Sequence, residues 1–152
     1  MLTAFFIPKF MDDALAQAKL AFERDEVPVG AVFVYKNEII SAAGNEVIGR
    51  NDPTAHAEIL VLREAAKQLE TVHLIEGDIY VTLEPCAMCA QALALARVRR
   101  LYFGAYDPKG GGVDHGARIF DQPTCHHRPE IIGGLSESKC AALLQSFFQL
   151  KR

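Results

Sequence analysis

Residues 78–105, DIYVTLEPCAMCAQALALARVRRLYFGA, contain the alternation of segments that decides the fold. The apolar run 78–83 predicts a short buried strand that ends before Pro85. The alanine-rich segment 86–98 predicts a helix, and Arg100–Ala105 predicts another strand. A helix between two strands indicates an α/β domain in which helices cover a sheet.

The segments on either side extend this alternation. The remaining expected elements are an amphipathic helix over residues 10–25, a hairpin of strands over 27–35 and 38–44, a buried helix opened by Asp52-Pro53-Thr54, a short extended piece within 127–134, and a helix over 136–152 with Ser136 as its N-cap. We therefore predict a single domain over residues 1–152. Its architecture is a mixed sheet with helices on both faces, in three α/β/α layers.

Composition sets the broad class of protein. The chain has 152 residues, of which 50% are hydrophobic, enough for one domain with a substantial core. The N-terminal apolar stretch is interrupted by Pro8 and Lys9, unlike a signal peptide. No apolar run approaches the roughly 20 residues that a membrane span needs. We therefore expect a soluble, cytoplasmic protein without a membrane partner.

Charge is distributed unevenly along the chain. The formal net charge is −3, but residues 1–76 carry 7 Lys and Arg against 12 Asp and Glu, whereas residues 77–152 carry 9 against 7. The second half is thus net positive, and an anionic partner is expected to meet that half.

Two short fragments contain the residues suited to chemistry, His56-Ala57-Glu58 and Pro85-Cys86-Ala87-Met88-Cys89. Each lies where a helix is expected to begin. Cys86 and Cys89 share one helix face, and a helix N-terminus favours the thiolate form. One histidine and two cysteines provide three ligands for Zn²⁺ and leave the fourth tetrahedral position open, which is the pattern of a catalytic site. Glu58 is then placed to take a proton from water and pass it to a leaving group.

Other interpretations of these fragments exist. An isolated Cys-x-x-Cys is as often a pair of small core residues or a redox pair, and an isolated His-x-Glu has little meaning. Both together, in this order and at helix starts, favour a metal site. Cys125-His126-His127 has no suitably spaced fourth ligand and is interpreted as a polar loop or a substrate-binding surface, and His73 and His115 have no evident partner.

The combination H-x-E…P-C-x-x-C is the signature of zinc-dependent deaminases of bases. With EVPVGAV, NEVIGRNDPTAHAEI, YVTLEPCAMCAQAL, YFGAYDPKGG and CAALLQSFFQLKR, nearly the whole chain resembles the bacterial tRNA-specific adenosine deaminases of the cytidine-deaminase-like superfamily. The resemblance implies a five-stranded sheet, one Zn²⁺ per chain and a homodimer. It also implies hydrolytic deamination of the wobble adenosine in the tRNA anticodon loop to inosine.

The resemblance also implies roles for individual residues. The metal ligands would be His56, Cys86 and Cys89, the catalytic proton shuttle Glu58, the base-binding residues Asn45, Val27, Pro28 and Ala57, the ribose contact Asp107, and the anticodon-loop contacts Phe147, Phe148, Lys151 and Arg152. The chain departs from many relatives at GVDHGARIF and at His126-His127, in the loop expected to face RNA.

Two other functions share part of this pattern. A deaminase of a free nucleobase or nucleoside, such as cytosine or guanine, would use the same metal and Glu58 but needs a closed pocket and no basic surface. A zinc-stabilised RNA-binding module would need no carboxylate such as Glu58 beside a closed structural site.

Overall fold

The computed structural model describes residues 8–151. In chain order its elements are α1 (Pro8–Glu23), β1 (Gly30–Tyr35), β2 (Glu38–Gly44), α2 (Val47–Arg50), α3 (Ala57–Leu69), β3 (Gly77–Leu83), α4 (Ala87–Ala96), β4 (Arg100–Ala105), the 3₁₀ helix η1 (Ile119–Asp121), β5 (Glu130–Ile132) and α5 (Glu137–Leu150).

Within residues 8–151, five strands form one mixed sheet in the order β2-β1-β3-β4-β5. β1 runs antiparallel to β2 and β3, whereas β3, β4 and β5 are parallel. Because α4 connects the parallel pair β3 and β4, residues 78–105 form the expected strand–helix–strand unit. The prediction of a five-stranded mixed sheet is confirmed.

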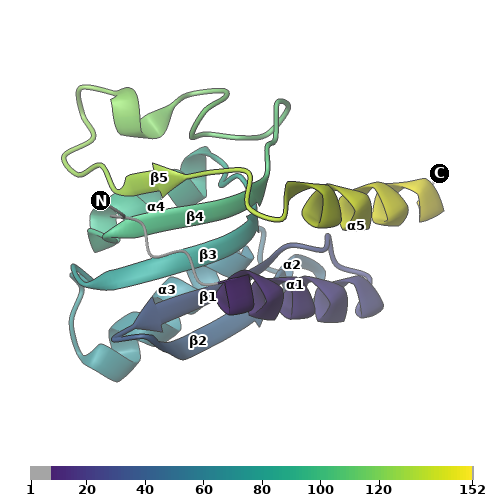
Figure 1. The fold of residues 1–152 in the computed structure, drawn as a ribbon, viewed down its shortest axis with the longest axis horizontal. Coiled ribbons are helices and arrows are strands. Elements are labelled where there is room, and N and C mark those ends of the chain that lie inside the picture. The colour runs from purple at the N-terminus through teal and green to yellow at the C-terminus, as the bar shows by residue number, and fades with distance from the viewer. Residues whose placement is uncertain (1–7, 152) are drawn as a thin grey trace.

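Helices cover both faces of the sheet (Figure 1). α1 and α5 lie side by side on one face, and α3 and α4 cover the other. Successive side chains of a strand point to opposite faces, so Phe33 joins the core under α3 and α4 while Val32 joins the core under α1. The predicted three-layer α/β/α architecture is therefore confirmed.

The helix that contains Glu58 begins later than the sequence suggested, at Ala57. Asp52 Oδ1 accepts hydrogen bonds from the backbone N–H (2.8 Å) and the hydroxyl (2.7 Å) of Thr54. Such a side-chain turn competes with helix formation, and it delays the start of α3. His56 is consequently an extended residue just before the helix, with φ −74° and ψ 151°.

Three further boundaries differ from the prediction. β1 begins at Gly30 rather than at residue 27, and the four-residue helix α2 and the 3₁₀ helix η1 had no recognisable sequence signal. Ser136 does precede α5, but it has a left-handed φ of 54° and its side chain makes no capping hydrogen bond. In the described part of the chain, the structure has no helix with the length and apolar character to cross a bilayer.

Candidate active site

His56 and Cys86 occupy equivalent positions at the starts of two helices. Each has an extended backbone, and the carbonyl groups of His56 and Cys86 accept the first helical hydrogen bonds of α3 and α4, from Leu60 N (3.1 Å) and Ala90 N (2.8 Å). Cys86 follows the C-terminal end of β3, the edge of the sheet where ligands of α/β proteins usually bind. The fold therefore brings together two residues that are far apart in sequence.

Cys89, in the first turn of α4, completes a cluster with these two residues. Cys86 Sγ lies 3.6 Å and Cys89 Sγ 3.5 Å from His56 Nδ1, and the three potential ligand atoms all lie within 4.8 Å of one another. One imidazole nitrogen and two sulfur atoms suit Zn²⁺. Three protein ligands would leave one tetrahedral position for a reactant.

The two thiols have different acidities in this arrangement. A hydrogen bond from the Cys89 thiol lowers the pKa of Cys86 to about 4, assisted by His56. The same hydrogen bond, together with burial, raises the pKa of Cys89. Hydrogen bonding with Cys86 in turn raises the pKa of His56. Cys86 is therefore a thiolate at neutral pH, the form that binds metals.

Glu58 lies in the first turn of α3, two residues after His56. The residue is 3% exposed, and within residues 8–151 its Oε1 atom is buried without a hydrogen-bond partner. Burial raises the pKa of Glu58 to about 7. A buried carboxylate oxygen without a partner is costly, so the presence of Glu58 beside the His-Cys-Cys cluster fits a metal site in which Glu58 exchanges protons near neutral pH.

These groups face a pocket of about 720 Å³. Its lining includes His56, Glu58 and Cys86, together with residues from the loop before β1, from the C-terminal end of α5 and from the segment after β4. Among the described residues, Asp25, Glu26, Val27, Val29, Asn45, Val47, Ile48, Leu83, Glu84, Asp107, Gly110, Phe147 and Lys151 complete the lining. The pocket is thus built from both halves of the chain.

The residues expected to bind the base divide into two groups. Val27 and Asn45 line the pocket, whereas Pro28 and Ala57 are buried and are not among its lining residues. Asn45 Oδ1 accepts a hydrogen bond from Ala57 N (2.8 Å), which ties the residue to the start of α3. The other polar group of the Asn45 side chain, its amide NH₂, can donate to a ligand.

The C-terminal helix contributes a wall of the pocket. Phe147 is buried, lines the pocket and packs edge to face against Phe22, with ring centroids 5.5 Å apart. Lys151 also lines the pocket, with its Nζ paired to Asp25 and 5.4 Å from the Phe147 ring centroid. Phe148 is 49% exposed and lies outside the lining, and Arg152 lies outside the described residues.

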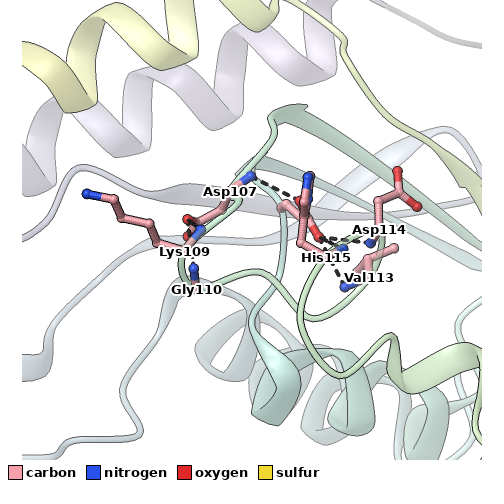
Figure 2. Close-up of polar contacts among 7 residues, drawn as sticks. Asp107, Lys109, Gly110, Val113, Asp114 and His115 are labelled. Carbon is pink, nitrogen blue, oxygen red and sulfur yellow. Dashed lines mark hydrogen bonds and ion pairs between the residues drawn. The ribbon is translucent and has the colours of Figure 1, made fainter.

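Asp107, after β4, closes a tight turn at the edge of the pocket. Its Oδ1 accepts hydrogen bonds from the backbone N–H groups of Lys109 (3.2 Å) and Gly110 (2.9 Å), as Figure 2 shows. The backbone N–H of Asp107 donates to Glu84 Oε1 (3.0 Å). Asp107 is therefore held both by its backbone N–H and by its carboxylate.

Sequence reasoning missed Glu84 and its partner His115. Glu84 is 2% exposed, and His115 Nδ1 lies 2.8 Å from Glu84 Oε1. Burial alone would raise the pKa of Glu84, but hydrogen bonds from Asp107 N, His115 and Asp114 N outweigh it, so the pKa is lowered and the carboxylate stays ionised. A glutamate between a buried strand and Pro85-Cys86 was the available signal, since such a charge requires partners.

The site and fold are those of a base deaminase, and the comparisons agree. A family model for MafB19-like deaminases matches residues 8–152. The tRNA-specific adenosine deaminase of Agrobacterium fabrum is 54% identical over 143 residues, which cover 94% of each chain. That of Rickettsia typhi is 44% identical over 144 residues, covering 93% of this chain and 97% of the relative.

A solved structure from studies of A-to-I editing by tRNA:A34 deaminases at the wobble position of transfer RNA superimposes with a TM-score of 0.90. It is 54% identical in sequence, and the match covers 91% of this chain and all (100%) of the other. The chain belongs to the family of tRNA-specific adenosine deaminases.

Proposed function

We propose that this protein is a hydrolase that converts the wobble adenosine of tRNA to inosine. The main observation behind the proposal is the state of Glu58: within residues 8–151 its buried Oε1 atom has no hydrogen-bond partner, and its pKa is raised to about 7 beside a His-Cys-Cys cluster. In this reaction the oxygen of water adds to C6 of the adenine, the C6–N6 bond breaks, and ammonia leaves. Glu58 accepts a proton from the water and delivers it to the departing nitrogen.

One Zn²⁺ per chain is proposed to be held by His56 Nδ1, Cys86 Sγ and Cys89 Sγ. When bound, zinc activates water as a nucleophile at neutral pH. The protein provides the surroundings of the metal. The N-termini of α3 and α4 favour the negative charge of the thiolates. Burial brings the pKa of Glu58 close to neutral, where the residue can both accept and donate a proton.

The adenine is proposed to enter as a base turned out of its stack. Asn45 would donate its amide NH₂ to the base, with Val27, Pro28 and Ala57 around it; Val27 and Asn45 line the pocket, while Pro28 and Ala57 lie buried behind it. Turning a base out of its stack costs least in a single-stranded loop, because no base pair has to be broken. This requirement supports an anticodon loop as the substrate.

The rest of the loop is proposed to contact the edge of the pocket. Asp107 is assigned to a ribose hydroxyl, and Phe147, Phe148, Lys151 and Arg152 to the flanking nucleotides. Lys151 is paired with Asp25, so it would exchange this carboxylate for an RNA phosphate. The positive balance of residues 77–152 supports the same partner.

A homodimer in the cytoplasm is the proposed state of the protein. Its support, besides the resemblance, is a groove of about 370 Å³ lined by side chains of α3, of α4 and of the segment between α3 and β3. Two of these side chains, Val72 and Leu95, are 73% and 68% exposed. Covering such an apolar face is a common reason for self-association. Light scattering at micromolar concentration should give a dimer mass, and a monomer would refute this part of the proposal.

The function is tested by comparing substrates. Purified protein is incubated with an RNA anticodon stem-loop containing a wobble adenosine, and separately with free adenosine, guanine and cytosine, while ammonia is measured. Of these substrates, only the stem-loop should yield ammonia, and Glu58→Gln should abolish this reaction. Deamination of a free base without deamination of the stem-loop would replace the proposal by the free-base function. Binding of the stem-loop without ammonia would indicate an RNA-binding module.

A further inference from the structure

Glu84 is a buried carboxylate that collects hydrogen bonds from one loop. Among the described residues, its Oε2 accepts from the backbone N–H groups of Val113 (3.2 Å), Asp114 (2.9 Å) and His115 (3.1 Å). Its Oε1 accepts from Asp107 N (3.0 Å) and His115 Nδ1 (2.8 Å). Figure 2 shows these donors along the loop. Because an ionised carboxylate only accepts, His115 Nδ1 must carry the proton.

The same loop is packed against the start of α4. Gly112 N donates to Pro85 O (2.8 Å). A Cβ atom on Gly112 would lie 2.5 Å from Ala87 N, and one on Gly111 would lie 2.5 Å from the Glu84 carboxyl carbon. There is no room for a side chain at either position. Glu84 therefore joins the loop 107–115 to the helix start that contains Cys86.

Only part of this loop reaches the pocket. Asp107 and Gly110 line it, as does Glu84 itself, whereas Val113, Asp114 and His115 do not. The carboxylate thus holds the non-lining part of the loop through Oε2 and through the bond between Oε1 and His115 Nδ1, and it holds the lining part through a single bond from Asp107 N. The bond from Asp107 N is thus the one hydrogen bond between the Glu84 carboxylate and the lining part of the loop.

We propose that Glu84 is a positioning residue, whose Oε1 atom holds Asp107 at the edge of the pocket where Asp107 contacts the ribose of the bound RNA. The inference rests on the proposed function, because it assigns Asp107 to RNA. Glu84 also lines the pocket, but both of its carboxylate oxygens are occupied by hydrogen bonds from the loop, so its effect on RNA binding passes through Asp107.

The substitution Glu84→Gln isolates this bond. Glutamine has the same shape, and its oxygen can keep the three N–H donors of residues 113–115. Its NH₂ group then replaces Oε1, and it can donate to His115 Nδ1 once that ring takes its other neutral tautomer. Only the backbone N–H of Asp107 then loses its acceptor, because it faces the NH₂ group of the new glutamine. The substitution therefore releases Asp107 while the rest of the loop stays attached.

The test is a double-mutant cycle on RNA binding by the zinc-loaded protein. The Kd of a fluorescent RNA anticodon stem-loop is measured by anisotropy for wild type, Glu84→Gln, Asp107→Ala and the double variant. Glu84→Gln should raise Kd about 3- to 10-fold, the effect of one hydrogen bond, with zinc content unchanged and kcat at saturating RNA within about twofold. In the Asp107→Ala background, Glu84→Gln should cause no further rise in Kd, because the side chain that Glu84 positions is already absent.

Glu26→Gln provides the matched control. Like Glu84, Glu26 is buried and accepts hydrogen bonds from backbone N–H groups, those of Ile48 (3.1 Å) and Gly49 (2.8 Å), but it is not bonded to the Asp107 loop. Its effect on Kd should be the same with and without Asp107. Equal effects of Glu84→Gln in both backgrounds, or a lower kcat with unchanged Kd, would overturn the inference. A wild type that binds the stem-loop without forming inosine would refute the proposed function, while the binding cycle would still decide the role of Glu84.

A second pair of variants covers the case in which Glu84→Gln does not fold. His115→Leu removes one donor to Oε1, and His115→Asn restores an N–H close to the position of Nδ1. RNA binding should weaken with leucine and recover with asparagine, again only when Asp107 is present. Equal Kd values for the two variants would contradict the role assigned to Oε1.

Discussion

At the scale of single residues, the candidate site holds two acids in opposite electrostatic situations. Cys86 is stabilised as an anion by hydrogen bonds, and its pKa is lowered to about 4. Glu58 is destabilised as an anion by burial, and its pKa is raised to about 7. Pairs of groups whose environments push their pKa values apart are typical of sites in which one binds and the other moves protons.

The assignment of Cys86 as a ligand gives the first prediction. Cys86→Ala leaves His56 and Cys89, and two ligands hold zinc far more weakly than three. Elemental analysis should give one zinc per chain for freshly purified wild type and a small fraction of that for the variant. Cys125→Ala, which removes a thiol outside the cluster, should retain the metal. Two zinc ions per wild-type chain, or none, would contradict the assignment.

Glu58 should behave differently from the ligands. Glu58→Ala removes the proton shuttle but no metal donor, so zinc content and melting temperature should stay near those of wild type. Activity on the anticodon stem-loop should fall by at least about 10²-fold, the usual size of general acid–base catalysis. If zinc were lost together with activity, Glu58 would be a ligand instead of a shuttle.

At the scale of elements, the site depends on how closely the helices approach the sheet. α1 crosses β1 at Gly30, where an added Cβ would lie 2.1 Å from Ala14 O and 2.4 Å from Ala18 N. Both contacts are helix backbone, which cannot move without shifting α1 as a whole. The contact therefore fixes the height of α1 above the strand that follows pocket residues Val27 and Val29.

Gly30→Ala should therefore destabilise the protein. Overpacking of a close contact typically costs about 1–3 kcal/mol, which urea unfolding followed by circular dichroism can resolve. Gly49→Ala is the matched control, because a Cβ there would meet only Glu26 Oε2, at 3.5 Å. A Gly30→Ala variant as stable as wild type would show that α1 does not depend on this close approach.

The C-terminal end of α5 is the second element whose position matters. Lys151 is expected to bind RNA phosphate after leaving Asp25, so Lys151→Ala should weaken stem-loop binding and reduce the salt slope of log Kd by about 0.7. Lys139→Ala, at the other end of α5 and outside the pocket lining, should change neither quantity. Asp25→Asn, which frees Lys151, should tighten binding. An unchanged slope for Lys151→Ala would remove α5 from the RNA-binding surface.

Elements and site residues were predictable to different degrees, for a physical reason. The strand–helix–strand unit follows from local patterns, because helix starts and strand ends are signalled by nearby residues. The pairing of His56 with Cys86 and Cys89 was predictable although 30 positions separate His56 from Cys86, because imidazole and thiolate groups are typical zinc ligands and the H-x-E…P-C-x-x-C signature links them. The start of α3 was misplaced because Asp52 and Thr54 form a turn that resembles a helix cap. Glu84 was missed because its donors belong to residues 107–115 and become neighbours only in the folded chain.

At the scale of the whole molecule, both halves of the chain are needed for one site. His56, Glu58 and Asn45 come from the acidic first half, whereas Cys86, Asp107 and Lys151 come from the positive second half. The candidate catalytic residues His56, Glu58 and Cys86 line the same pocket as Asp107, Phe147 and Lys151, which are assigned to RNA.

The most direct test of the account is sequencing of total tRNA for inosine after incubation with the purified protein. Wild type should convert adenosine at the wobble position of its substrate tRNA to inosine and leave other adenosines unchanged, and Glu58→Gln at the same zinc content should produce none. Inosine at positions outside the anticodon loop, or no inosine from a protein that holds one zinc per chain, would contradict the claim that this pocket deaminates the wobble adenosine.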